Sequence, residues 1–372
     1  MTKRPLRSAL PLILSALPHL FPLAVCIALL LAAAVSAADA QERPAALQER
    51  PAAVQERPAA LACTQGRSLL PDLEAKGAMP DLVREAASTI NGEGRLYRIE
   101  REGLAPSFLF GTMHLSDPRI LALPAAAEAA LAQARGVVIE TTDILDPQRM
   151  AATLLSRADL TILPPGHTLA EVVGPDGMAD VLPLLEARGT PAAAVARLQP
   201  WFVAAGLMMP DCEVKRTAGG AKVLDVAIAE RAKGEGLELE GLESAAEQLE
   251  ALASMPLDLQ ADNLVATVEL ADRLPDIFET MIALYLDGRI ALIGPATERA
   301  LPSGTDEASS LAVTQAFEDR VVHRRNALMA ERLRPILAKG GRFVAVGALH
   351  LPGETGLVEG LRRTGWTVTR AD

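Results

Sequence analysis

The chain has 372 residues, a formal net charge of −11 at pH 7, and hydrophobic residues at half of its positions. This length can bury a sizeable core in one or two domains. The acidic excess provides no basic surface for a phosphate backbone, which argues against nucleic acid as a partner. Aromatic residues make up only 3% of the chain, so Ala, Leu, Val and Ile must form most of the core.

Residues 1–40 have the pattern of an export signal peptide. Three Lys or Arg residues among the first seven positions precede an apolar run from Leu10 to Val35, and small residues follow in "AVSAADA" (34–40). A positive start, an apolar run and a small-residue cleavage site are typical of secretory signals. We therefore expect the mature protein in the periplasm or outside the cell.

The apolar run does not favour a membrane-spanning helix. Prolines interrupt its first half, and the uninterrupted part from Leu23 to Ala34 is shorter than the roughly 20 residues that a span requires. We predict no stable membrane span after signal cleavage. An uncleaved signal anchor is the alternative interpretation of the same segment.

A linker is predicted after the signal peptide. Residues 41–61 contain three copies of a seven-residue repeat, "QERPAAL", "QERPAAV" and "QERPAAL". Such a period can indicate a coiled coil, but a proline in every copy would break each helix. We interpret residues 41–62 as a disordered linker and residues 63–372 as a single folded domain.

Two cysteines remain in the predicted mature chain, Cys63 and Cys212. An oxidising compartment outside the cytoplasm allows such a pair to form a disulfide. The alternative is two unrelated thiols, because sequence spacing does not show that two cysteines are close in space.

The predicted elements of the folded region alternate between strands and helices at both ends of the chain. The first part predicts a helix at 78–90, strands at 95–100 and 107–111, a helix at 123–134 and a strand at 136–140. The middle predicts a short strand at 237–241 among helices at 147–156, 168–187, 190–208, 222–233, 244–254, 257–270 and 274–286. The last part predicts a helix at 313–338, a strand at 342–347, a helix at 354–364 and a strand at 366–370. This order predicts an α/β fold in which two pseudo-symmetric βαβ-type halves form a mixed sheet, with a largely helical middle insertion.

Two of the apolar strands end in the same motif. "SFLFGTMHLSDP" (107–118) and "RFVAVGALHLPG" (342–353) each close with Gly-x-x-His, which gives His114 and His350 equivalent positions. Glycine lets the chain turn sharply after the strand. Because ligands gather outside the carboxyl ends of strands in open α/β sheets, we predict that the two rings meet at one edge of the sheet.

A carboxylate follows a third strand, where "GVVIETTD" presents Glu140. If strand 136–140 lies beside strand 107–111, Glu140 and His114 emerge at the same edge. Two imidazoles and one carboxylate suit a divalent transition metal with open positions for water and substrate. Such a metal would lower the pKa of bound water and polarise a carbonyl. Without a metal, a histidine and a glutamate could act as a general base and its orienting partner.

The remaining polar candidates have simpler explanations. His167 lies in a predicted turn and His323 in a predicted helix, and we expect neither at the site. Glu243 follows strand 237–241 and is a second carboxylate candidate. An acidic residue at the start of a helix is explained as well by the helix dipole.

Several segments resemble the TraB/PrgY/GumN family, which includes the Tiki proteases. The resemblance rests on "FLFGTMHLSDP", "VVIET", "LQPWF", "VLDVAIAERAKGEGLELEGLESAAEQL", "RRNALMAERL" and "FVAVGALHLPGETGLVEGLRRTGWTV". It extends from about Cys63 to Val368, and the paired Gly-x-x-His motifs are its hallmark. The resemblance implies an α/β fold related to erythromycin-esterase and ChaN-like proteins. It also implies a metal-dependent, peptidase-like hydrolase of a peptide or protein substrate, with Mn or Co as the metal.

By position, the resemblance assigns the metal-binding and catalytic roles to His114, Glu140 and His350. The family's Arg-Asn pair falls on Arg325 and Asn326. From a helix, this pair could orient a carboxylate or bind a substrate carbonyl; a surface helix pair is the alternative.

Two further functions remain open from the sequence. One is a haem- or metal-binding protein of the ChaN-like type, which the low aromatic content disfavours because haem pockets are usually rich in aromatic residues. The other is a non-metal esterase with a His–Glu base, which only metal dependence would separate from the peptidase. Asp225 and Glu243 match further acidic positions of the family pattern without a defined role. The sequence indicates neither the substrate's identity nor an oligomeric state.

Overall fold

Six short segments form the strands of the protein in its computed structural model, which describes residues 66–300 and 318–372. Each strand boundary lies within one residue of its prediction: β1 (Leu96–Glu100), β2 (Ser107–Thr112), β3 (Gly136–Ile139), β4 (Glu238–Gly241), β5 (Arg342–Gly347) and β6 (Thr367–Arg370). The predicted signal peptide (1–40), the linker (41–62) and Cys63 lie outside the described residues.

The strands form one mixed sheet in the order β4-β3-β5-β2-β1-β6. The strands β4, β3, β5 and β2 are parallel, and β1 pairs antiparallel with both β2 and β6. Every residue of β2, β3 and β5 is buried. Parallel strands covered on both faces need apolar side chains on both, which explains their continuous hydrophobic sequences.

The order of the strands corrects one expectation. Strand β3 does not lie beside β2, because β5 is inserted between them and pairs with both. Residue Gly347, at the end of β5, pairs with Thr112, at the end of β2. The two Gly-x-x-His motifs therefore follow directly adjacent strands.

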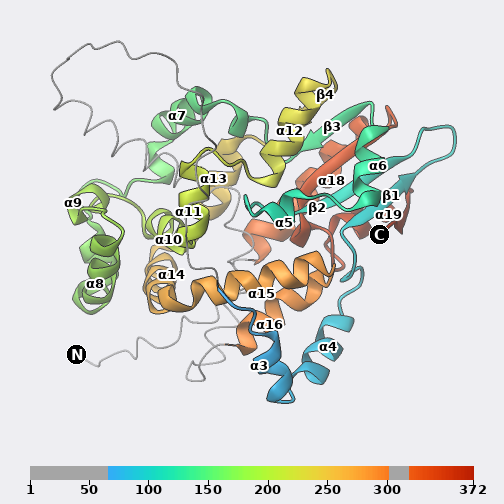
Figure 1. Ribbon diagram of the computed structural model, residues 1–372. Coiled ribbons are helices and arrows are strands. Elements are labelled where there is room, and N and C mark those ends of the chain that lie inside the picture. The colour runs from blue at the N-terminus through green and yellow to red at the C-terminus, as the bar shows by residue number, and fades with distance from the viewer. Residues whose placement is uncertain (1–65, 301–317) are drawn as a thin grey trace, which may run out of the picture.

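Helices account for most of the remaining described chain (Figure 1). The first half contains α3 (Leu70–Ala75), α4 (Met79–Ala87), α5 (Pro118–Leu121), α6 (Ala125–Ala132), α7 (Pro147–Ser156), α8 (Leu169–Ala187), α9 (Ala192–Val195) and α10 (Pro200–Met208). The second half contains α11 (Asp211–Ala218), α12 (Leu224–Gly234), α13 (Ala245–Ala253), α14 (Leu257–Glu269), α15 (Leu274–Leu286), α16 (Ile293–Arg299), α18 (Arg324–Leu337) and α19 (Leu357–Arg363). Of these, α3, α5, α11 and α16 were not predicted.

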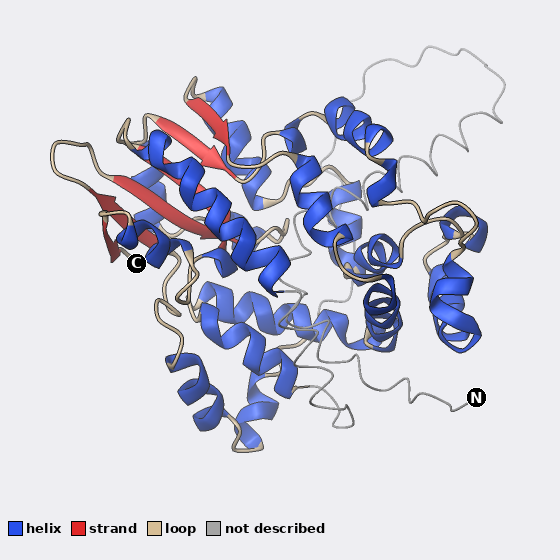
Figure 2. Cartoon of the chain, turned by 180° about the vertical axis from the view of Figure 1, so that it is seen from behind, coloured by secondary structure: helices blue, strands red, loops and turns tan. Residues whose placement is uncertain are grey.

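Helices cover both faces of the sheet (Figure 2). On one face, α18 and α19 pack on the strands through residues such as Leu333 and Val344. On the other face, α6, α12 and α15 contribute to a larger core that contains Ile228 and Phe343. Neighbouring β5 residues Phe343 and Val344 belong to opposite cores because successive side chains of a strand alternate in direction.

Three predicted helices differ from the structure. The segment 168–187 forms α8 with a kink at Gly174, where φ is 81°. The segment 190–208 forms two helices, α9 and α10, separated by the extended residue Gln199. This break follows from Pro200, since a proline disfavours helical backbone at the residue before it. The predicted helix 313–338 is described only from Glu318, where a π-helical turn (Asp319–His323) leads into α18.

The helical region beside the sheet has its own small core. Residues such as Leu169, Val181 and Leu264 join α8, α10 and α14 there. Within 66–300 and 318–372, no helix combines the length and the apolar composition that crossing a bilayer would require.

Candidate functional site

The carboxyl ends of β2, β5 and β3 meet at one edge of the sheet, because these three strands are parallel and adjacent. His114 lies two residues after β2, Glu140 lies one residue after β3, and His350 lies in the 3-10 turn η6 (Ala348–His350) after β5. All three side chains are buried, with exposed fractions of 6%, 4% and 3% for these residues in that order. Their meeting depends on β5 lying between the other two strands.

His114 is held between two carboxylates. Its Nδ1 donates to Oδ2 of Asp225 at 2.5 Å, and its Nε2 lies 3.6 Å from Oε1 of Glu140. Asp225, on α12, also accepts from the hydroxyl of Thr112 at 2.7 Å. Burial alone would lower the pKa of His114, but the carboxylates of Asp225 and Glu140 raise this pKa to about 10.

His350 faces the same carboxylate oxygen from a different environment. Its Nδ1 donates a hydrogen bond to Oδ1 of Asn326 at 2.7 Å. The amide nitrogen of Asn326 donates to the backbone carbonyl of Thr355 at 3.0 Å, which fixes the orientation of the amide. This arrangement leaves the lone pair on Nε2, which lies 3.8 Å from Oε1 of Glu140. Burial and the neighbouring Arg325 charge lower the pKa of His350 to about 3, so its ring is neutral at pH 7.

The two oxygens of Glu140 have separate partners. Oε1 faces the two rings and accepts from the backbone N–H of Gly347 at 2.7 Å. Oε2 accepts from Arg325 at 2.6 Å and from the amide of Gln248 at 3.1 Å. Burial opposes ionisation, yet Arg325 and the two histidines hold the pKa of Glu140 well below its usual range. Glu140 is therefore a fixed carboxylate with one oxygen directed at the rings.

Arg325 links Glu140 to the second carboxylate candidate, Glu243. The buried guanidinium donates to Glu243 at distances between 2.7 and 3.1 Å. Its remaining nitrogen donates to the carbonyl of Val321 at 3.3 Å, within the π-helical turn. Burial raises the pKa of Glu243, although Arg325 opposes that rise. Glu243 thus supports Arg325 instead of facing the rings.

The two motif glycines have different structural roles. A Cβ atom on Gly347 would lie 3.2 Å from Nε2 of His114 and 3.3 Å from Oε1 of Glu140, in the space between the three site side chains. A Cβ atom on Gly111 would instead lie 2.8 Å from Cα of Ala348, where the end of β2 packs against η6. One glycine keeps the centre open, and the other allows the two motif segments to pack closely.

The donor atoms suit a divalent transition metal in type and nearly in spacing. Ligand atoms that share an ion at about 2.1 Å lie about 3.0–3.5 Å apart, and the two Nε2 atoms lie 3.6 and 3.8 Å from the shared carboxylate oxygen. Bonding each ring through Nδ1 to a second residue is the usual way to orient a metal-binding histidine. In the described ranges, no group of three or more His, Cys, Asp or Glu side chains has the compact arrangement of a formed metal centre. A slight inward movement of the two rings would be needed to create one.

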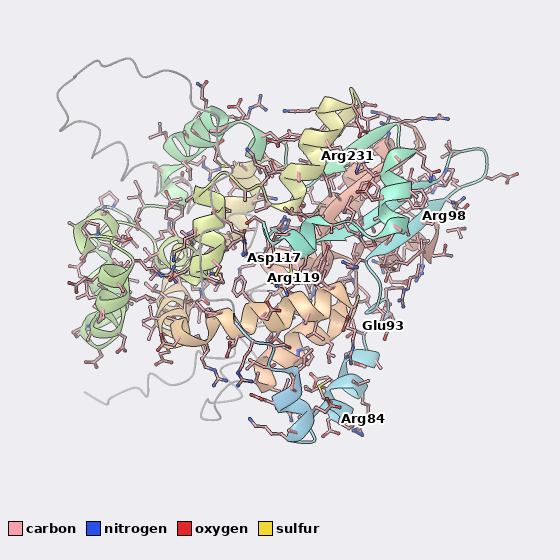
Figure 3. The ribbon with its side chains drawn as sticks, viewed as in Figure 1. Arg84, Glu93, Arg98, Asp117, Arg119 and Arg231 are labelled. Carbon is pink, nitrogen blue, oxygen red and sulfur yellow. The ribbon has the colours of Figure 1, made fainter. Side chains whose placement is uncertain are left out.

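The segment that follows the first motif histidine is fixed by contacts that sequence reasoning missed. The backbone N–H of Ser116 donates to buried Glu213 at 2.7 Å. Asp117 caps α5 and pairs with Arg119 at 2.9 Å, and Arg119 also pairs with Glu279 on α15 at 2.7 Å. Figure 3 shows Asp117 and Arg119 beside α15. Only the cap could have been found from sequence, since Asp before Pro is a typical helix start.

The other histidines of the described chain lie elsewhere. His167 is exposed in the turn before α8, and its described hydrogen bonds involve only its backbone, with Pro164 and Arg197. His323 is half-buried at the end of the π-helical turn. Neither is among the residues that contact Glu140. Their placement agrees with the expectation that they lie away from the site.

Comparison with protein families gives a match over most of the chain. The model of the TraB/PrgY/gumN family matches residues 95–370. The chain belongs to the TraB/PrgY/gumN family. Searches of curated proteins and of solved structures each gave no significant match.

The TraB/PrgY/gumN match covers the whole sheet and the whole candidate site. It begins just before β1 and ends with the last residue of β6. The helices α3 and α4 precede it, so residues 66–94 are described structure outside the family match. The sequence resemblance is thereby confirmed at the level of the family and of its mixed α/β fold.

Proposed function

We propose that this TraB/PrgY/gumN protein is an exported, metal-dependent hydrolase of peptide bonds. The observation that carries the proposal is the convergence of two imidazole Nε2 atoms on one carboxylate oxygen, at 3.6 and 3.8 Å. Both rings are also fixed from behind, by Asp225 and Asn326. Peptide as the substrate class and Mn or Co as the metal rest on the family resemblance.

In this proposal, His114, His350 and Glu140 hold a divalent transition metal. When bound, the metal would lower the pKa of a water molecule and polarise the carbonyl of the scissile bond. Asp225 and Asn326 keep the two Nε2 atoms directed at the centre. Arg325 and Gln248 hold the second oxygen of Glu140 and so fix the direction of the first. Gly347 leaves room between the three side chains.

The geometry gives less support to the two alternatives. A non-metal esterase needs a histidine base with a pKa near the working pH, but the pKa values here are about 3 for His350 and about 10 for His114. Axial ligation of haem needs open space in front of a ring nitrogen for the planar macrocycle. Both Nε2 atoms instead face the Glu140 carboxylate at less than 4 Å.

The proposal is tested by metal analysis and a peptide-cleavage screen, with and without a chelator. The mature protein should contain a near-stoichiometric transition metal and lose cleavage activity with the chelator. His114→Ala and His350→Ala should each remove most of the metal and nearly all activity while leaving the fold intact. Glu140→Gln should keep the shape of the site and lose its charge. His167→Ala is the matched control and should behave as wild type.

One result would contradict the shared site directly. Full activity in His350→Ala, together with unchanged metal content, would show that His350 neither binds the metal nor takes part in the reaction. Cleavage that persists without any bound metal would contradict the role of the metal and favour a metal-independent mechanism with a histidine–glutamate base.

A further inference from the structure

A cavity of about 470 Å³ lies away from the carboxylate–imidazole cluster, between α4, the loop that follows it, η4 (Ile290–Leu292) and the C-terminal elements α19 and β6. Its volume is within the range of sites that bind small ligands. Much of its wall comes from residues 83–93, which precede the family match. The cavity is therefore built where this flanking segment packs against the family fold. Figure 3 labels Glu93, at the end of the loop, and Arg84, on α4.

Part of the cavity wall is apolar and exposed. Val83 and Ile90 line the cavity with exposed fractions of 43% and 39%. In the part of the chain that the structure describes, they are two of only five large hydrophobic side chains with such exposure. Leu292, Ala86 and Ala87 extend the same wall. An apolar group bound there would remove both exposed side chains from water.

Three arginines and one glutamate, Glu93, are the charged residues of the lining, so the cavity carries a positive excess although the protein as a whole is acidic. Arg362 and Arg370 have acidic partners: Arg362 pairs with Glu359, and Arg370 lies 3.2 Å from Glu93. The third arginine, Arg289, is half-buried, and its side chain has no hydrogen bond or ion pair with any described residue. A guanidinium removed from water in part, without an anion beside it, favours binding of an anion.

We propose that this cavity binds a carboxylate attached to a short apolar chain. The planar guanidinium of Arg289 matches a carboxylate with two parallel hydrogen bonds, and the wall of Val83 and Ile90 accommodates the apolar part. A free fatty acid and the C-terminus of a peptide with an apolar last residue share this chemistry. The inference does not depend on the proposed hydrolase function, because the cavity shares no lining residue with the carboxylate–imidazole cluster.

The cavity has one structural link to that cluster. The carbonyl of Ile90 accepts from the backbone N–H of Gly353 at 2.8 Å, three residues after His350. The loop that forms the cavity wall is thus bonded to the segment that carries the second motif histidine. A ligand that moves Ile90 would act on that segment through this bond.

The test is calorimetric titration of the mature protein in the presence of a chelator, which keeps the measurement independent of any metal. The probes are octanoate, an acetylated Ala-Ala-Leu peptide with a free C-terminus, and the same peptide as its C-terminal amide. We expect one-to-one binding of at least one carboxylate probe and none of the amide. Binding of octanoate alone would identify a free acid as the ligand source, and binding of the peptide acid alone would identify a peptide C-terminus.

Two variants examine the site from different sides. Arg289→Gln removes the cation and should weaken binding by about tenfold or more, as expected for loss of a charged hydrogen bond. Ala87→Phe fills the cavity from an exposed helix position and should abolish binding with Arg289 still present. The control Arg84→Gln removes an exposed arginine of the same helix, which pairs with Asp81 and does not line the cavity. Absence of binding by both carboxylates, or unchanged binding in Arg289→Gln and Ala87→Phe, would overturn the inference.

Discussion

His114 and His350 carry the same ring but have opposite electrostatic surroundings. The partner of His114 is the carboxylate of Asp225, whereas the partner of His350 is the neutral amide of Asn326. Burial and the charge of Arg325 lower the pKa of His350 to about 3. Burial would also lower the pKa of His114, but Asp225 and Glu140 raise it to about 10. The equivalence of the two sequence motifs therefore does not extend to the charges of their rings.

The variant Asp225→Asn tests whether the carboxylate of Asp225 raises the pKa of His114. Asparagine keeps the size and can still accept from Nδ1, but the negative charge is lost, so the pKa of His114 should fall from about 10. NMR titration of the ring measures this shift. Metal affinity or cleavage activity should fall about 10- to 100-fold, as is usual when the partner of a metal-binding histidine is changed.

A matched control is Asp159→Asn, which removes an exposed carboxylate paired with Arg157. It should leave the His114 titration unchanged. An unaltered His114 pKa in Asp225→Asn would show that the carboxylate is not what sustains the charged ring.

The sequence identified His114, Glu140 and His350 because each follows an apolar strand at its carboxyl end. It could not identify the residues behind them. Asp225 and Asn326 lie on helices far along the chain, and no local spacing connects them to the rings that they bond. Family resemblance pointed to both positions but defined a ring-orienting role for neither.

At the scale of the secondary-structure elements, the ends of β5 and β2 each depend on a glycine. Gly347 has an ordinary backbone conformation, with φ of −50°, which any residue could adopt. A glycine is needed there because a side chain would enter the space between the site residues. Gly111 serves the packing of β2 against η6. Substitution of the two glycines should therefore have different effects.

Gly347→Ala should fold normally but lose metal binding and activity, because the new methyl group occupies the space between His114 and Glu140. Gly111→Ala should instead lower the free energy of unfolding by about 1–3 kcal/mol, the usual cost of an overpacked core. Denaturant unfolding and metal analysis of both variants measure the two effects. A destabilised Gly347→Ala with normal metal content would contradict this assignment.

Local patterns predicted the elements well but not their arrangement. The three central strands β2, β3 and β5 were found because each is a short apolar run. The α9–α10 break could have been placed from Pro200. The insertion of β5 between β3 and β2 depends on contacts between distant parts of the chain. Periodicity in a short window contains no information about such contacts.

At the scale of the whole molecule, the buried charges make stability depend on pH. His350 has a lowered pKa, so between about pH 6.5 and 3 the unfolded chain binds a proton that the folded chain does not. Glu140, whose pKa is lowered from its usual 4.5, adds to the loss of stability as the pH falls below about 4.5. His114 has the opposite effect because its pKa is raised. Its contribution to the free energy of unfolding is complete below pH 6.5 and is lost as the pH rises through about 10.

We therefore expect the free energy of unfolding, without metal, to be highest near pH 6.5 and to fall on both sides. Urea unfolding at a series of pH values in chelator measures it. His350→Gln should remove part of the fall between pH 6.5 and 3. An acid limb identical to that of wild type would show that His350 is not the group responsible.

The start of the mature chain and its cysteine pair can be examined in one measurement. Cys212 is buried in α11, and its predicted partner Cys63 lies outside the described residues, so the disulfide remains a prediction. Intact-mass analysis of the exported protein, without reductant, should give a first residue between Ala38 and Gln41 and the loss of two hydrogens. Such a bond would stabilise the fold by on the order of 4 kcal/mol. An intact Met1 in the membrane fraction would favour the signal anchor, and two free thiols would exclude the disulfide.

The position of β5 has a consequence for when the protein can first act. Residues Ser107 and Arg342, which are bonded where β2 and β5 begin, are 235 positions apart in sequence. During synthesis, β2 and β3 are made early, but the strand that joins them comes almost last. Sheets whose neighbouring strands lie far apart in sequence fold slowly. Until the final segment has been made, the two earlier strands have no common neighbour, and the second histidine is absent. An incomplete chain, whether still being synthesised or truncated, therefore has no assembled site, and the chemistry proposed here is confined to the finished molecule.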